Sequence, residues 1–254
     1  MRRLARRRSS RSDQGRFLID GPTLLAEAVD AGVEIEGVYV EPAGMGEPAV
    51  QSAVRVGSPV YEVPAGALKK VLDVVTPQSL VAVARITTAS LDEVVGSAAA
   101  GGVPLLVLVE LQDPGNAGTL IRVAEASGCA GVVLTERSVD AHNPKTVRAS
   151  AGSLFRVPVV QDVAFASVVA ACDRLNVTTV ATVASSGASL DDAPLDGALA
   201  FLIGSEAHGL TPEAVERAGH RVSIPMAGRV ESLNAGVAGA VVAFEAARRR
   251  RCAN

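Results

Sequence analysis

Aromatic side chains are scarce in this chain, which has no Trp, two Tyr and five Phe among its 254 residues. Modules that bind unpaired bases use exposed aromatic rings as stacking surfaces. The composition therefore argues against base stacking as a main mode of nucleic-acid binding. Because 48% of the residues are nonetheless hydrophobic, the core must be built from Val, Ala and Leu, which is typical of layered α/β domains.

Cysteines are also few. Cys129, Cys172 and Cys252 lie far apart without the short spacings of metal ligands, and an odd number gives no disulfide framework. We therefore expect a reducing compartment and no metal site. No run approaches the ~18 consecutive apolar residues of a membrane helix, and no signal-peptide core follows the basic N-terminus. The protein is accordingly expected to be cytoplasmic and to have no membrane partner.

Net charge is only −3, but it is unevenly distributed. Residues 1–16 carry seven Arg and one Asp, and residues 248–251 are four Arg. The two ends together have a net charge of +10, so the remaining body carries −13. The two basic ends could contact phosphate groups, or they could be a solvated arm and a solvated helix end; the sequence leaves both interpretations open.

The glycine fingerprints of common nucleotide sites are absent. Residues 112–122, QDPGNAGTLIR, form a Pro/Gly turn between an apolar run and a helical pattern, a place where phosphate-binding loops often lie. This turn has neither the G-x-G-x-x-G of dinucleotide-binding folds nor the G-K-[ST] ending of a P-loop. A nicotinamide-dependent oxidoreductase is therefore disfavoured.

Strand and helix patterns alternate in the first part of the chain. Strands are expected at residues 17–19, 35–40, 59–63 and 80–86, with helices between them that include one over 65–74. This alternation over ~70 residues predicts a compact α/β unit. The residues before it are too uniformly charged to be buried, so we expect either a mobile arm or a basic first helix.

Apolar runs in the second part are typical of buried parallel strands. PLLVLVEL at 104–111 is nearly continuous, FLI at 201–203 stops at Gly204, and a third run ends at Pro225, which has no N–H to donate. Ligands of parallel α/β sheets bind at the carboxyl ends of the strands. The residues that follow these runs are therefore the candidates for a binding site.

Four phrases follow one another along this part of the chain. They are N-x-G-x-x-x-R from Asn116 to Arg122, FLIGSEAHGL at 201–210, RVSIPM at 221–226 and RVESLNAGVAGAVVAFEAARRR at 229–250. In this order and spacing they closely resemble the SpoU (TrmH) family of RNA ribose 2′-O-methyltransferases, within the SPOUT superfamily. The resemblance extends from about residue 103 to about residue 250.

The resemblance implies an α/β fold in which a trefoil-knotted, parallel-sheet domain follows a small α/β domain similar to a ribosomal protein. No periodicity in the sequence indicates the knot. Weaker similarity, in GRFLIDGPTLLAEAVDAG and TPQSLVAVARI, identifies the first domain. The expected division is a basic arm at 1–16, an RNA substrate-binding domain at 17–90, a linker at 91–102 and the methyltransferase domain at 103–254. A homodimer is also implied, for which the small-residue helix at 235–247 offers a face; burial within one chain is the alternative.

Five residues of these motifs are implied to form the catalytic site: Asn116, Arg122, Glu206, Ser232 and Asn234. Asn116 would orient the site, and Arg122 would reach the target nucleotide. Glu206 could fix a guanidinium such as that of Arg122 in a bidentate pair. Structural interpretations stand beside these roles. Asn116, Ser232 and Asn234 are helix-capping residue types, Arg122 could be merely solvated, and Glu206 could lie near a helix start.

S-adenosyl-L-methionine is the cofactor that the resemblance implies, held largely by backbone groups in three loops after strands. The residues concerned are Thr182, Val183, Ala184, Gly204, Ile224, Met226 and Leu233. Apolar side chains among them would pack against adenine without leaving a charge signature in the sequence. Lys145 and Arg148 could bind RNA phosphates together with Arg122, with plain solvent exposure as the alternative.

The expected reaction is methyl transfer to a ribose 2′-hydroxyl of structured RNA. Because a guanidinium stays protonated at neutral pH, Arg122 is interpreted as the electrostatic stabiliser of the developing alkoxide and not as the base. 23S ribosomal RNA is the favoured substrate, since a separate N-terminal domain is present. Methylation of transfer RNA, or a non-catalytic ribosome-assembly factor of the same fold, are the alternatives.

Overall fold

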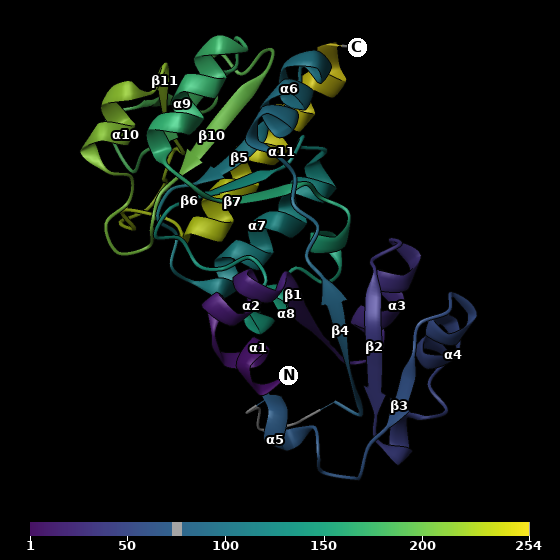
Figure 1. Cartoon of the computed structure of the whole chain (residues 1–254). Helices are drawn as coiled ribbons and strands as arrows, with labels where there is room; N and C mark the ends of the chain where they lie inside the picture. The colour runs from purple at the N-terminus through teal and green to yellow at the C-terminus, as the bar shows by residue number, and fades with distance from the viewer. Residues whose placement is uncertain (73–77, 254) are drawn as a thin grey trace. The chain divides into compact units, whose positions relative to one another are not determined.

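The computed structural model describes residues 1–72 and 78–253 and is coloured along the chain in Figure 1. The chain folds into two compact units, which comprise Met1–Thr87 with His142–Arg156, and Thr88–Ala141 with Val157–Asn254. The polypeptide therefore passes from one unit to the other three times, and each unit is described by itself below.

A mixed sheet forms the first unit. Among the described residues its four strands lie in the order β1 (Arg16–Asp20), β4 (Leu80–Arg85), β2 (Ile35–Val40) and β3 (Val60–Glu62). Strands β1 and β2 run antiparallel to β4, whereas β3 runs parallel to β2. All four predicted strands are thus confirmed, and none of their ends differs by more than one residue from the prediction.

Helices flank this sheet. They are α1 (Arg2–Arg6), α2 (Arg8–Gln14), α3 (Pro22–Asp30), α4 (Pro48–Arg55), α5 (Lys69–Leu72) and α8 (Pro144–Ala149), with 3-10 turns η1 (Pro42–Gly44) and η2 (Ser153–Phe155). Pro22 and Pro48 begin their helices because the fixed φ of proline suits the first helical turn. The helix predicted over 65–74 begins only at Lys69, and residues 73 and 74 of that prediction lie outside the described residues.

The arginine-rich N-terminus is folded onto the sheet. Leu4 is 3% exposed and belongs to the same apolar cluster as Leu18 and Leu68. The buried Arg11 donates from Nη1 to the Leu4 carbonyl oxygen at 2.6 Å, which joins α2 to α1. Of the two predicted alternatives, the structure has the basic helix and not the mobile arm, because Leu4 provides an apolar anchor.

Residues 142–156 fold with the first unit, although the sequence places them inside the methyltransferase domain. Arg148 Nη1 donates to Asp20 Oδ2 on β1 at 3.0 Å. The Phe17 ring centroid lies 5.0 Å from that of His142 and 6.2 Å from that of Phe155. These contacts interrupt the continuous domain expected over 103–254, and they could not be recognised from a segment that is simply polar.

The second unit is a parallel sheet with helices on it. Its seven strands within the described residues lie in the order β7, β6, β5, β10, β8, β11, β9. Their bounds are β5 (Leu105–Leu108), β6 (Val132–Thr135), β7 (Val159–Val163), β8 (Thr178–Thr182), β9 (Ala188–Ser189), β10 (Leu199–Ile203) and β11 (His220–Ser223). Every residue of β5 and β10 is buried, so the near-continuous apolar runs were correctly interpreted as strands covered on both faces.

The helices of the second unit include a pair that matters for the site. They are α6 (Leu91–Gly101), α7 (Pro114–Ser127), α9 (Phe165–Arg174), α10 (Pro212–Arg217) and α11 (Ala235–Ala253). The C-terminal helix α11, yellow in Figure 1, packs against α7 and β10. A Cβ on Gly239 of α11 would collide with Leu120 of α7. The small residues of α11 therefore let these two helices approach closely.

The flexible linker predicted at 91–102 is instead helix α6. Its N-cap Ser90 accepts a hydrogen bond from the Glu93 N–H at 3.2 Å, and the Glu93 carboxylate accepts from the Ser90 N–H at 2.7 Å, which completes a capping box. Val94 and Val95 of α6 are buried in the core of the second unit. The small residues that suggested flexibility pack against the sheet, and the unit boundary falls just before them, between Thr87 and Thr88.

Candidate cofactor and active site

A pocket of about 330 Å³ opens at the carboxyl ends of three adjacent strands, β10, β8 and β11. One loop after each strand contributes to its wall, and Ala235 and Ala238 at the start of α11 complete it. This volume lies within the ~300 to 1,000 Å³ that is usual for small-molecule sites. The pocket therefore occupies the edge of the sheet at which parallel α/β folds bind ligands.

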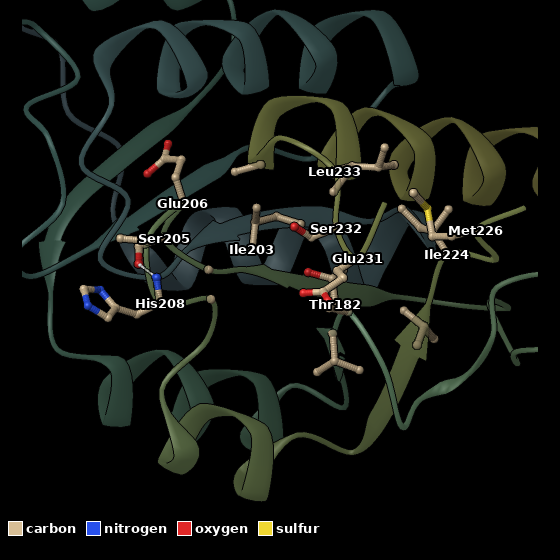
Figure 2. Close-up of a pocket in the computed structure, with 18 residues that line it drawn as sticks. Thr182, Ile203, Ser205, Glu206, His208, Ile224, Met226, Glu231, Ser232 and Leu233 are labelled. Atoms are coloured by element: carbon tan, nitrogen blue, oxygen red, sulfur yellow. Dashed lines mark hydrogen bonds between the residues drawn. The ribbon is translucent and has the colours of Figure 1, made fainter. Parts of the chain in front are cut away.

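All seven residues predicted to bind the cofactor line this pocket: Thr182, Val183, Ala184, Gly204, Ile224, Met226 and Leu233. Figure 2 shows the apolar Ile224, Met226 and Leu233 on one side and Glu206 on the other, with Ser232 between them. Segments that are separated by 20 residues or more in the sequence thus converge on one cavity, which has an apolar half and a polar half.

The loop after β10 is folded tightly around Gly204. Ser205 and Gly209 exchange two backbone hydrogen bonds, with N···O distances of 3.0 and 2.8 Å. A Cβ on Gly204 would overlap the backbone of Gly209 and Leu210. Only glycine fits at position 204, and the resulting turn holds Glu206 at the edge of the pocket. The His208 ring points away from Ser232 (Figure 2).

A hydrogen bond joins the first motif to the second. Asn116 Nδ2 donates to Glu206 Oε1 at 2.5 Å. The N-cap of α7 is Asp113, whose Oδ1 accepts from the Asn116 N–H at 2.7 Å, so Asn116 itself does not cap the helix. Nor does Glu206 lie at a helix start, because α10 is capped by Thr211. The structural alternatives for Asn116 and Glu206 are therefore wrong, and both side chains meet beside the pocket.

Asn234 has the capping role that its residue type suggested. Its Oδ1 accepts from the Val237 N–H at 3.2 Å at the start of α11. A Cβ on Gly236 would lie 3.1 Å from this oxygen and 3.1 Å from Asn116 Oδ1. The side chains of Asn116 and Asn234 thus lie on either side of Gly236, which has no side chain. Ser232, two residues earlier, lines the pocket.

Of the five predicted catalytic residues, Glu206 and Ser232 line the pocket, Asn116 and Asn234 lie beside it, and Arg122 does not line it. Its side chain is exposed on α7, and within residues 1–72 and 78–253 no ion pair joins it to Glu206. The bidentate pair predicted for these two residues is not formed. Arg122 follows Asn116 by six residues, a helical rotation of roughly 600°, so the two side chains leave α7 on different faces.

Lys145 and Arg148 both lie on α8 in the first unit. Lys145 is exposed. Arg148, with 36% of its side chain exposed, pairs with Asp20, which has 6% exposed. Burial raises the pKa of the Asp20 carboxyl above its ordinary value, and the Arg148 charge opposes that rise. Arg148 therefore has a structural partner that the sequence did not indicate, and contact of either residue with RNA stays a prediction.

Nine residues that line the pocket were not among the predicted site residues: Ile203, Ser205, Ala207, His208, Gly209, Val222, Glu231, Ala235 and Ala238. Ser205 and Glu231 stand inside the recognised phrases, next to residues that were chosen. Ala235 and Ala238 are three positions apart, so they share one face of α11. The signal that marks them is their small size, because it leaves room for a ligand beside the helix.

Each helix in the described part of the chain is too short or too polar to cross a bilayer. Across that same part, no three His, Cys, Asp or Glu side chains are grouped so that they could hold a metal ion.

Comparison with known proteins accounts for both units. The model of the family described as "SpoU rRNA Methylase family" matches residues 104–244, and that of the "MRM3-like substrate binding domain" matches residues 1–82. A relative from Bacillus subtilis (strain 168), 23S rRNA (guanosine(2553)-2'-O)-methyltransferase RlmP, is 30% identical to this chain. The alignment spans 93% of this chain and 90% of the relative.

Solved structures agree with this match. The SpoU methyltransferase AviRb from Streptomyces viridochromogenes, in complex with the cofactor AdoMet, has a TM-score of 0.86 and 25% identity, covering 98% of this chain and 96% of its own. An AdoMet-bound rRNA methyltransferase from Sinorhizobium meliloti has a TM-score of 0.81 and 28% identity, covering 98% and 92%. The chain belongs to the SpoU methyltransferase family, with an N-terminal substrate-binding domain, and the resemblance seen in its motifs is confirmed.

Proposed function

We propose that this protein transfers a methyl group from S-adenosyl-L-methionine to a ribose 2′-hydroxyl of ribosomal RNA, with 23S rRNA as the substrate. The observation that carries the proposal is the convergence of the family motifs of residues 116–122, 201–210 and 221–250 on one edge of the parallel sheet. A shared fold alone would be weaker support, because one fold hosts many functions.

The pocket fits the proposed cofactor. Ile224, Met226 and Leu233 offer an apolar surface for an adenine ring, and the loop at Gly204 offers backbone at close range. When bound, S-adenosylmethionine supplies an electrophilic methyl group on a positively charged sulfur. The apolar half of the pocket would hold the base, and the half with Glu206 would face the RNA.

Positioning is the main contribution that we assign to the chain. Holding an attacking oxygen about 3 to 3.5 Å from the methyl carbon, in line, can supply ~7 to 11 kcal/mol of the barrier reduction. Ser232 is placed to hydrogen-bond the ribose, while Asn116 and Glu206 fix each other at the pocket edge. Asn234 anchors the start of α11 beside them.

Arg122 acts on the RNA side of the reaction. An arginine guanidinium is a cation with five donors, so Arg122 stabilises the alkoxide that develops on the ribose oxygen, and water or a phosphate takes the proton. Arg122 lies outside the pocket, which is consistent with a residue that meets the substrate and not the cofactor.

Ribosomal RNA is favoured over transfer RNA for two reasons. The relative RlmP is named for a 23S rRNA guanosine and aligns over both units of this chain. The first unit matches a substrate-binding domain, which a large folded RNA would engage away from the methylated nucleotide. A cytoplasmic site of action follows from this proposed substrate.

We further propose that the protein acts as a homodimer and that its C-terminal segment is knotted, as the family resemblance implies. Val237 and Phe244 on α11 are 49% and 44% exposed, which is unusual for apolar side chains of this size. A second copy would cover them. Light scattering should give twice the monomer mass, and Phe244→Asp should give the monomer.

The test of the proposed function is methyl transfer. Incubation with S-adenosylmethionine labelled in the methyl group and total RNA from a strain lacking the gene should label 23S rRNA. RNA from the parent strain should take up little label, because the position is already modified. Binding of RNA and cofactor without any transfer would support the non-catalytic assembly factor instead.

A further inference from the structure

The N-terminal helices present arginines from a fixed scaffold. Leu4 anchors α1 in the apolar cluster of the first unit, together with Leu72 of α5 and Leu68 just before it. Helices α1 and α5 pack against one another, as their neighbouring positions in Figure 1 show. Lys69 and Lys70 on α5 are exposed, as are Arg2 and Arg3 on α1. These four cations therefore come from two adjacent, packed helices.

Arg11 has a different role in the same region. It is 3% exposed, and its Nη1 bonds the Leu4 carbonyl oxygen at 2.6 Å. It thereby fastens α2 to the end of α1. Arg11 therefore stabilises the contact between α1 and α2, whereas Arg2 and Arg3 are exposed to solvent.

At the other basic end of the chain, Arg248 and Arg249 make internal contacts, whereas Arg251 is exposed. Arg249 donates from Nη2 to the carbonyl oxygens of Leu190 and Asp191, at 2.6 and 2.8 Å. Arg248 and Arg249 also bind the carboxylate of Glu245. The charges of Arg248 and Arg249 are therefore partly neutralised by Glu245 within the second unit, whereas the side chains of Arg2, Arg3, Lys69 and Lys70 are exposed.

We propose that Arg2, Arg3, Lys69 and Lys70 form a basic platform that binds backbone phosphates of the substrate RNA. The inference rests on the proposed function for the identity of the RNA, and it assigns the contact to particular side chains of the first unit. Outside the two basic ends, the chain has a net charge of −13, which would repel a polyanion such as RNA. A local cationic surface is therefore needed to bind the RNA.

Anchored cations suit this task better than a disordered arm. A mobile segment loses conformational entropy when it binds, whereas helices that are already packed lose little. Phosphate contacts from Arg and Lys fix the register of a nucleic acid without reading its bases. The platform would therefore position the RNA, and base identity would be read elsewhere.

The test is the salt dependence of RNA binding. Each phosphate contact contributes about 0.7 to 0.9 to the slope of log Kd against log salt concentration. The quadruple variant Arg2→Gln/Arg3→Gln/Lys69→Gln/Lys70→Gln should therefore lose about 3 from the slope measured with a full-length 23S rRNA transcript. Its affinity for S-adenosylmethionine should be unchanged, since the pocket is formed by the second unit.

Matched variants keep the result interpretable. Arg2→Lys/Arg3→Lys/Lys69→Arg/Lys70→Arg preserves every charge and should keep the slope of the wild type. Arg55→Gln removes one exposed cation of α4, which donates a hydrogen bond to the Ser52 hydroxyl, and should leave the slope unchanged. Arg3→Gln should lower the slope. All of these substitutions are at exposed positions, and equal thermal midpoints would confirm that folding is retained.

An unchanged slope in the quadruple variant overturns the platform. If that variant also loses binding to phosphatidylglycerol vesicles, the four side chains form a membrane-directed surface instead. A fall of about 3 in the slope supports it. Methyl transfer by the wild-type protein is measured in the same samples. Failure of transfer with a normal slope change counts against the proposed function and not against the platform.

Discussion

Asn116 donates its side-chain amide to the Glu206 carboxylate across 2.5 Å, although 90 positions separate the two residues. Asn116 lies in the first turn of α7, which follows strand β5, and Glu206 follows strand β10. These strands pair directly in the sheet. The bond therefore links two family motifs at the same edge of the sheet.

Replacing Asn116 by alanine should impair catalysis and spare cofactor binding. The change removes a hydrogen bond between exposed groups, which costs about 1 kcal/mol, or roughly fivefold in kcat/KM. Steady-state methylation and calorimetry with S-adenosylmethionine measure the two effects. An unaltered rate would show that the bond is incidental, and a lost cofactor affinity would place Asn116 in the pocket wall.

Gly204→Ala should abolish cofactor binding. The added Cβ would overlap the backbone of Gly209 and Leu210, so the loop after β10 must move and the pocket must change shape. Gly228→Ala is the matched control, because a Cβ there meets nothing within 4 Å. Calorimetry should detect binding in the control and none in Gly204→Ala. Normal affinity in both variants would remove this loop from the cofactor site.

Much of this site was predictable because each strand end carries its own local signal. An apolar run that stops at Gly204 or Pro225 marks a carboxyl end, and family motifs added the residues that follow. The partner of Glu206 was not predictable, because the choice of Asn116 over Arg122 depends on which face of α7 each side chain leaves. That rotation appears only when both strands are placed in one sheet.

In the first unit, too, local features could be predicted from the sequence and long-range contacts could not. Its strands were predicted to within one residue, since alternation and turn residues are local features. The attachment of residues 142–156 depends on an ion pair across 128 positions, between Arg148 and Asp20. Helix α6 was missed although Ser90 and Glu93 form a capping box, because the small residues after them were interpreted as flexible.

Arg148→Ala should destabilise the first unit at neutral pH. The substitution leaves the largely buried Asp20 carboxylate without its cation, a loss of about 1 to 3 kcal/mol after allowance for the partial exposure of Arg148. Burial already raises the pKa of Asp20, and removing the cation raises it further. The loss should therefore shrink in acid, where Asp20 is protonated in both states.

Denaturant unfolding at neutral and acidic pH measures this loss. Lys145→Ala on the same helix is the control, since its side chain is exposed and it should leave stability within about 0.5 kcal/mol. If Lys145 contacts RNA, its alanine variant lowers the salt slope of binding by about 1. Equal stability of Arg148→Ala and the wild type would refute the structural role of the ion pair.

Glu245 should make stability depend on pH in the acid range. Hydrogen bonds from Arg248 and Arg249, and then their charges, lower its pKa from about 4.5 to about 2. A lowered folded-state pKa stabilises the protein above the unfolded value, so this contribution is complete above about pH 4.5 and is lost as the pH falls toward 2.

Glu245→Gln should therefore cost about 1 kcal/mol at pH 7, since the side chains are partly exposed, and less at pH 3. Glu213→Gln is the matched control: its carboxylate lies 3.5 Å from Arg217, and 63% of its side chain is exposed. Identical acid dependence in Glu245→Gln and the wild type would contradict the assigned role.

The measurement that tests the central claim most directly is the chemical position of the methyl group. A 2′-O-methyl ribose cannot take part in alkaline cleavage, so label transferred by the protein to 23S rRNA should be recovered in an alkali-resistant dinucleotide. The yield should fall about a hundredfold or more in Arg122→Lys, which keeps the charge but not the planar guanidinium. Label recovered in alkali-sensitive mononucleotides would place the methyl group on a base and would contradict the account.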